Sequence, residues 1–128
     1  MKKDNIIIEV LESSKKEIKN LKNDFIETAK FFYLGDLKSG FEKIKFLSDI
    51  LSDFFFFWND VYKQTENRKL YEINNIFSEK LSEALEEIKK NDFIKVADFF
   101  YFEFLVLLDK YIELIPELKR QIKNGRIN

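Results

Sequence analysis

Apolar residues recur along the first quarter of the chain at alternating intervals of four and three, which is the spacing of one helix face. Lysine, glutamate and asparagine fill most of the positions between them. Gly35 ends this pattern and Asp36 can cap the next helix, so a two-residue joint is expected here. The sequence therefore predicts a helix over about 4–34. Its inward positions are Ile7, Leu11, Ser14, Ile18, Leu21, Phe25, Thr28 and Phe32.

Three more segments carry a helical pattern, over about 36–63, 67–90 and 92–123. A polar stretch at 64–67 separates the first two, and Asn91-Asp92 repeats the short joint before the last. The third helix is the most polar, so its buried stripe should be narrow. The second helix should turn these residues inward: Phe41, Ile44, Leu47, Leu51, Phe54, Phe55, Trp58 and Tyr62. The fourth helix should turn these inward: Phe93, Ala97, Phe100, Phe104, Leu107, Tyr111, Leu114 and Leu118.

Four helices with short joints predict an all-α, up-down-up-down four-helix bundle, with residues 1–128 forming a single domain. Three glycines and one proline are too few for a sheet protein with many turns. The proline, Pro116, lacks an N–H and crowds the preceding turn, so we expect a kink or break near it.

One similarity lies within the chain itself. Residues 23–33 and 91–101 agree at eight of eleven positions, including Asn-Asp-Phe-Ile at the start and Phe-Phe-Tyr at the end. A true repeat could break the first helix at Asn23-Asp24. Because the apolar pattern continues through Leu21 and Phe25, we favour an unbroken helix, and coincidence in a phenylalanine-rich chain stays open.

Composition excludes much chemistry. The chain has no histidine and no cysteine, which removes the commonest catalytic bases, thiol nucleophiles and soft metal ligands. No phosphate-binding loop or nucleophile elbow is present. We therefore expect no enzyme activity, no metal and no cofactor.

Charge limits the partners. A net charge of −1 does not favour binding to nucleic acid, which requires neutralisation of phosphates. The longest apolar stretch is interrupted by charges that are costly in a bilayer, so we expect no membrane span and a cytoplasmic protein. The interrupting residues are Lys95, Asp98, Glu103, Asp109 and Lys110.

Aromatic residues exceed what one core needs. The chain has 15 phenylalanines, concentrated at 54–57 and 99–104, and consecutive rings go around a helix. On helical wheels several apolar side chains fall among charged positions, and contiguous patches of this kind mark interaction sites. The candidate partner-binding residues are Phe46, Phe56, Phe57, Phe99, Phe102 and Val106. Two other interpretations stay open: the rings fill corners of the bundle, or they contact a membrane surface.

Glu103 is the one acid at the border of the apolar face of the fourth helix. It is therefore the candidate for a buried polar group with a raised pKa or a buried ion pair. A structural ion pair or simple solvation is the more ordinary interpretation, and catalysis is not favoured.

Two motifs in the chain resemble those of a known group. Val96-Ala97-Asp98 followed by Tyr101-Phe102-Glu103-Phe104 is similar to a pattern in the last helix of small, largely uncharacterised helical proteins of Firmicutes. Gly35-Asp36 is similar to the helix joint of those proteins, while Phe102 stands where they have tyrosine. Small four-helix flagellar export chaperones have a comparable shape without a shared motif. The resemblance implies a helical bundle and no catalytic residue.

Two functions follow as expectations. The first is a non-enzymatic interaction module, adaptor- or chaperone-like, that binds a protein partner or itself, with a homodimer expected. The alternative is a bundle that binds a small apolar ligand in a pocket between helices, with Glu103 holding a polar group.

Overall fold

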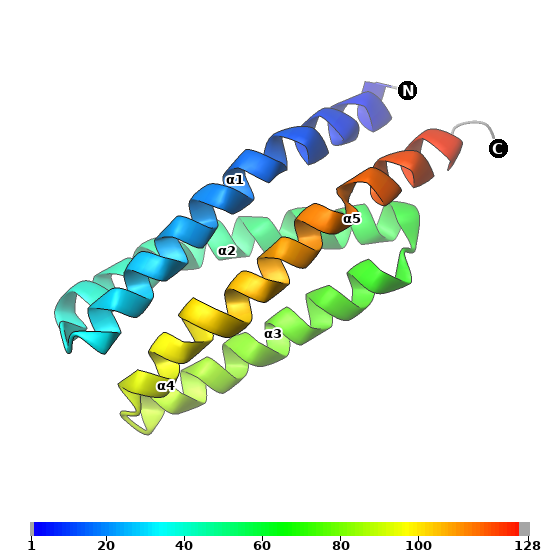
Figure 1. The fold of residues 1–128 in the computed structure, drawn as a ribbon. Coiled ribbons are helices and arrows are strands. Elements are labelled where there is room, and N and C mark those ends of the chain that lie inside the picture. The colour runs from blue at the N-terminus through cyan, green and yellow to red at the C-terminus, as the bar shows by residue number, and fades with distance from the viewer. Residues whose placement is uncertain (1, 126–128) are drawn as a thin grey trace.

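The computed structural model describes residues 2–125, with side chains from residue 5 onward; residues 1 and 126–128 lie outside it. Its helices are α1 (Lys2–Tyr33), α2 (Leu37–Thr65) and α3 (Arg68–Lys89). A last helical run consists of α4 (Phe93–Asp98), a π-helical turn η1 (Phe99–Glu103) and α5 (Phe104–Gly125). Figure 1 shows these four rods side by side, running alternately up and down. The predicted all-α four-helix bundle is confirmed.

The two short joints use one device. Gly35 and Asn91 have φ angles of 76° and 59°, in the left-handed region that glycine and asparagine tolerate after a helix. The carboxylate of the next residue, Asp36 or Asp92, then accepts a hydrogen bond of 3.2 Å from the backbone N–H three residues on. Each joint therefore ends one helix and caps the next, as predicted.

The middle connection is fastened to α5. Asn67 caps α3 by accepting from the N–H of Leu70, and its amide donates to a carboxylate oxygen of Glu117 at 2.6 Å. This hydrogen bond, with help from nearby Lys69, holds the pKa of Glu117 below its usual value. The connection is thus held by side chains on the surface of α5.

Phe77 of α3 joins the four helices. Its ring centroid lies 6.5 Å from that of Phe25 on α1, 5.9 Å from Phe54 on α2 and 5.4 Å from Phe104 on α5. All but the half-buried Phe54 have no exposed surface, and most of these pairs meet edge to face or tilted, the arrangement that aromatic rings prefer. Phe77, which belongs to the narrow apolar stripe of the most polar helix, thus contacts a ring from each of the other three helices.

A buried polar pair lies beside this cluster. The hydroxyl of Tyr111 donates to the side-chain oxygen of Asn74 at 2.6 Å, and the amide of Asn74 reaches Asn59 at 3.3 Å. Burial raises the pKa of Tyr111, because the phenolate would have to lose its water. Helical periodicity alone did not predict this pair.

The two similar segments pack against each other. The ring centroids of Phe25 and Phe100 are 5.3 Å apart, and the ring of Phe32 stacks on that of Phe93 at 5.9 Å. Phe25 is equivalent to Phe93 in the two segments, and Phe32 is equivalent to Phe100. The two contacts are therefore the same contact with the segments interchanged. The runs are antiparallel, so they are related by an approximate two-fold axis. The first helix is unbroken through Asn23-Asp24, as favoured.

The inward face of α2 is less well covered than that of α1. All eight predicted inward residues of α1 are buried, whereas in α2 only Leu47 and Trp58 of the predicted set are. Phe41, predicted inward, is exposed at the edge of the bundle, where its ring still meets Phe32 at 5.4 Å. The reason is that α2 and α3 separate toward the Gly35 end, as Figure 1 shows.

The irregularity of the last helix is not at Pro116. The structure has no break there: α5 continues from Phe104 to Gly125 with Pro116 inside it. The regular pattern is interrupted earlier, at η1, where one turn contains an extra residue and hydrogen bonds span five residues. The helix therefore does not break at Pro116, whose exposed ring lies on the outside of the helix, and the predicted kink stays a prediction.

Gly40 allows α1 and α2 to approach closely. A Cβ placed on it would lie 2.8 Å from the ring of Phe32, which is itself buried. Alanine normally stabilises a helix interior relative to glycine by about 0.5–1 kcal/mol. We expect Gly40→Ala to lower the free energy of unfolding by about 1–3 kcal/mol, since the ring cannot move freely. Denaturant unfolding measures this, and Gly125→Ala, where a Cβ meets nothing, is the control.

Tyr33 links α1 to α4 by donating a short hydrogen bond to Asp98. Loss of hydration and, second, this carboxylate raise the pKa of Tyr33 to about 12. The unfolded chain ionises near 10, so the free energy of unfolding should fall as pH rises from about 10 toward 12. Tyr33→Phe should remove this part of the pH dependence in unfolding experiments. The same loss with Tyr71→Phe, an exposed tyrosine on α3, would contradict the assignment.

Candidate functional site

A groove opens between α2 and α3, which we call the α2–α3 groove. It has a volume of about 260 Å³, and its walls are aliphatic and aromatic apart from two serines. Phe100 of η1 lies at its base. The lining residues are Ile44, Leu47, Ser48, Leu51, Ser52 and Phe55 of α2 with Leu81, Ala84, Leu85 and Ile88 of α3. This spacing places side chains of one face of α2 along one wall of the groove and side chains of one face of α3 along the other wall.

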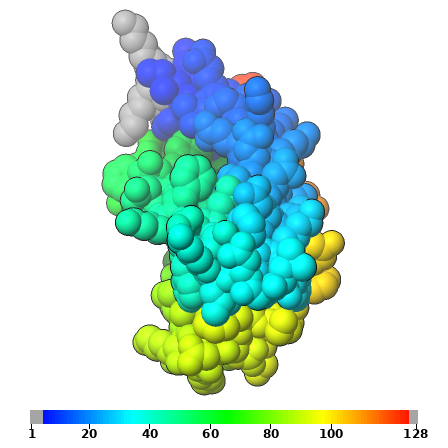
Figure 2. Space-filling model, turned by 90° about the vertical axis from the view of Figure 1, so that its left-hand side faces the viewer, coloured from blue at the N-terminus to red at the C-terminus, as the bar shows by residue number. Residues whose placement is uncertain are grey.

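The groove is an outer surface. Figure 2 views the end that carries both short joints and shows the molecule notched on its left side, between α2 above and the yellow-green end of α3 below. Leu85 is 55% exposed at the rim. Lys45 and Lys89 each lie one turn from a lining residue, so a lysine stands near each wall.

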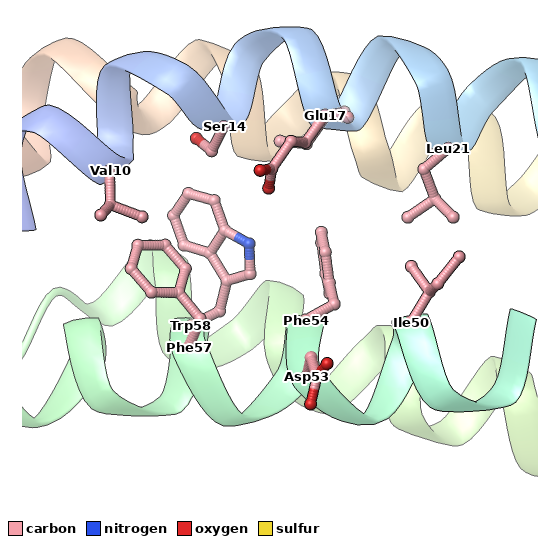
Figure 3. A pocket seen from close by; sticks show the side chains of 10 residues that line it. Val10, Ser14, Glu17, Leu21, Ile50, Asp53, Phe54, Phe57 and Trp58 are labelled. Atoms are coloured by element: carbon pink, nitrogen blue, oxygen red, sulfur yellow. The ribbon is translucent and has the colours of Figure 1, made fainter.

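A pocket of about 340 Å³ lies between α1 and α2, which we call the α1–α2 pocket. Apolar residues of both helices form its walls, and Figure 3 shows Phe54, Phe57 and Trp58 projecting from α2 toward α1. Glu17 and Asp53 bring two carboxylates to it. The lining residues are Val10, Ser14, Glu17, Ile18 and Leu21 of α1 with Ile50, Asp53, Phe54, Phe57 and Trp58 of α2.

A third apolar surface, the α3–α5 strip, consists of Ile76, Phe102 and Val106. These side chains line one shallow hollow with Lys80 and Glu103 beside them. Phe102 and Val106 are 58% and 56% exposed. The strip is short, and ion-paired residues border it.

The six predicted partner-binding residues fall on several faces of the molecule. Phe102 and Val106 lie together in the α3–α5 strip, and Phe57 lines the α1–α2 pocket. Phe46 lies near the first joint with the amine of Lys43 5.0 Å from its ring centre. Phe56 is the most exposed of the six, at 81%.

Phe99, the sixth residue, does not share a face with Phe102 and Val106. Its ring is half-buried and lies 5.8 Å from that of Phe104, in contact with the core. The wheel that grouped these residues assumed a regular helix. The extra residue in η1 changes the phase of the helix between Phe99 and Val106, so the grouping failed there.

Glu103 is not a buried polar group. Its side chain is 42% exposed and forms an ion pair with Lys80 at 3.2 Å. Glu83 and then Glu103 raise the pKa of Lys80 by favouring its charged form. Glu103 borders only the shallow hollow of the α3–α5 strip. The α1–α2 pocket, which Glu17 lines, was not predicted from the sequence.

Sequence reasoning missed these hollows for a physical reason. Helical periodicity says which side chains share a face, but not how far two helices separate. One signal was available: Ser48 and Ser52 interrupt the apolar side of α2, and Ser14 stands in the apolar face of α1. Small residues in such positions leave room between helices.

Two kinds of feature are absent from the described part of the chain. Residues 2–125 contain no group of three or more acidic, cysteine or histidine side chains placed to hold a metal ion. Over the same residues, no helix combines the length and the hydropathy that crossing a membrane requires.

The fold defines an all-α four-helix bundle protein with an uncovered groove. The chain belongs to the family described as a domain of unknown function (DUF8042), whose model matches residues 9–114. The match runs from the second turn of α1 through the first half of α5, so the three hollows described above lie within it. No curated protein and no solved structure matches the chain.

The position of Glu103 gives a direct prediction. A half-exposed ion pair contributes about 0.2–1 kcal/mol, whereas breaking a buried pair costs about 3–5 kcal/mol. We expect Glu103→Gln to change the free energy of unfolding by less than about 1 kcal/mol. If denaturant unfolding shows that Glu103→Gln lowers the free energy of unfolding by several kcal/mol, Glu103 belongs to a buried ion pair and this prediction is wrong.

Proposed function

We propose that this protein is a non-enzymatic helical interaction module that assembles with a second copy of itself through the α2–α3 face. Phe56 of each copy would enter the α2–α3 groove of the other. The observation that carries the proposal is that an 81% exposed ring projects from α2 one turn from Ser52, which lines the apolar groove.

The position of Phe56 follows from its neighbours on α2. Ser52, one turn before it, lines the groove, and Asn59, about one turn after it, bonds to Asn74 of α3. Phe56 therefore lies next to the row of α2 residues that faces α3, and it projects into solvent. A two-fold dimer needs a projection and a recess on one surface, because each copy offers the same patch.

Charge supports the same pairing. Phe56 has Asp53, Asp60 and Asp49 near it on α2, at three, four and seven residues away. Lys45 lies near the α2 wall of the groove, whereas Lys89 near the α3 wall is paired with Glu86 at 3.2 Å. A ring bordered by carboxylates that enters the groove brings opposite charges together at Lys45, which favours one orientation.

The other parts of the expectation remain proposals. We keep the cytoplasm as the compartment and the absence of enzyme activity as the working assumption. The likeness to helical proteins of Firmicutes and to export chaperones fits a module of this kind. The α3–α5 strip is a second, smaller surface for a different partner.

Molecular mass in solution tests the proposal. Burying one phenylalanine contributes about 1.5–3 kcal/mol, and the dimer contains two copies of the contact. We expect the wild type to sediment as a dimer and Phe56→Asp to raise the dissociation constant about 100-fold or more.

The matched control is Phe102→Asp, which adds the same charge on the α3–α5 strip and should leave the dimer intact. Circular dichroism should show unchanged helicity in both variants, because both rings are exposed. A monomeric wild type, or a dimer that only Phe102→Asp dissociates, would contradict the proposal.

A further inference from the structure

The α1–α2 pocket contains a hydrogen-bond donor that a ligand can reach. Trp58 is 1% exposed, and Figure 3 shows its indole nitrogen turned into the space between the carboxylate of Glu17 and the ring of Phe54. Among the described residues the buried polar atom that lacks a partner is Oε2 of Glu87, so the indole nitrogen is open to the pocket. An acceptor that enters the pocket can therefore take this N–H.

Glu17 brings a negative charge to the same space. It lines the pocket from α1 and forms no ion pair with a described residue. Asp53 also borders the pocket, but Figure 3 shows its carboxylate turned away from α1 and from Glu17. The pocket therefore has one carboxylate placed to meet a positive charge.

The walls suit an apolar body next to a positive charge. The rings of Phe57 and Trp58 are 5.1 Å apart, and those of Phe54 and Trp58 are 6.0 Å apart. Aromatic faces attract cations as well as apolar groups. The hydroxyl of Ser14 donates to the backbone of Leu11 at 2.6 Å, which leaves its oxygen free to accept from a ligand.

A volume of about 340 Å³ is within the range of small-molecule sites. We propose that the α1–α2 pocket binds a small amphipathic amine, whose ammonium group faces Glu17 and whose acceptor oxygen takes the N–H of Trp58. The apolar part of the amine lies against Phe54 and Phe57. This site is separate from the α2–α3 groove and does not depend on the dimer.

The chain provides its own reporter, since Trp58 is its single tryptophan. The probe is phenylalaninol, which has a phenyl ring, an ammonium group and a hydroxyl. It should shift the one indole N–H resonance in a saturable titration. 3-Phenylpropanol, which lacks the amine, should bind at least about tenfold more weakly, and 3-phenylpropanoate should be repelled.

Glu17→Gln tests the charge, and it is on α1, away from the proposed dimer face. It should weaken phenylalaninol binding about tenfold, the scale of one charge-assisted hydrogen bond. Glu9→Gln, an exposed acid on the same helix outside the pocket, is the matched control and should bind as the wild type does.

Trp58→Phe tests the donor by calorimetry. It should weaken the binding of phenylalaninol but not that of 3-phenylpropylamine, which has no hydroxyl. The proposal is overturned if phenylalaninol leaves the indole resonance unmoved at millimolar concentration or if 3-phenylpropanoate binds equally well. It is also overturned if Glu9→Gln weakens binding as much as Glu17→Gln does. Because the two glutamates are exposed, their comparison stands even where Trp58→Phe unfolds the protein.

Discussion

The bundle depends on the contact of Phe77 with rings from the other three helices. α3 has only a narrow apolar stripe, and within it Phe77 touches Phe25, Phe54 and Phe104. Close-packed aromatic clusters allow few arrangements, so this contact fixes where α3 lies relative to its neighbours. On one side of the cluster the Asn74–Tyr111 hydrogen bond holds the helices together. On the other side nothing similar joins α2 to α3, and the α2–α3 groove opens there.

The fold could largely be predicted from the sequence because helix ends and faces are local properties. Gly35-Asp36 and Asn91-Asp92 form the expected joints, and the inward positions of α1 are all buried. Three features could not be predicted. The π turn depends on the packing of η1 against neighbouring helices, Asn74 finds its partner only when α3 meets α5, and Pro116 is accommodated without breaking its helix.

The candidate sites were harder to predict for a related reason. Exposure of Phe56, Phe102 and Val106 follows from the wheel, and the structure places all three on the surface. A wheel cannot show that Phe57 lines a pocket or that Phe99 rotates toward the core after one extra residue. The surplus of aromatic rings thus divides into a core cluster, a pocket wall and a few projecting side chains. Only the last group is available to another molecule as an exposed surface.

We propose that two copies meet at the α2–α3 face. Because the chain has no cysteine, Ser82→Cys, one turn from Leu85 of the groove, accepts a single spin label. Pulsed dipolar spectroscopy then measures the distance between labels on different copies. A dimer through this face predicts a short separation of roughly 20–30 Å, two to three helix diameters, and a longer one for a label at Lys110→Cys on α5. Absence of coupling between labels at position 82, or a shorter distance at position 110, would contradict it.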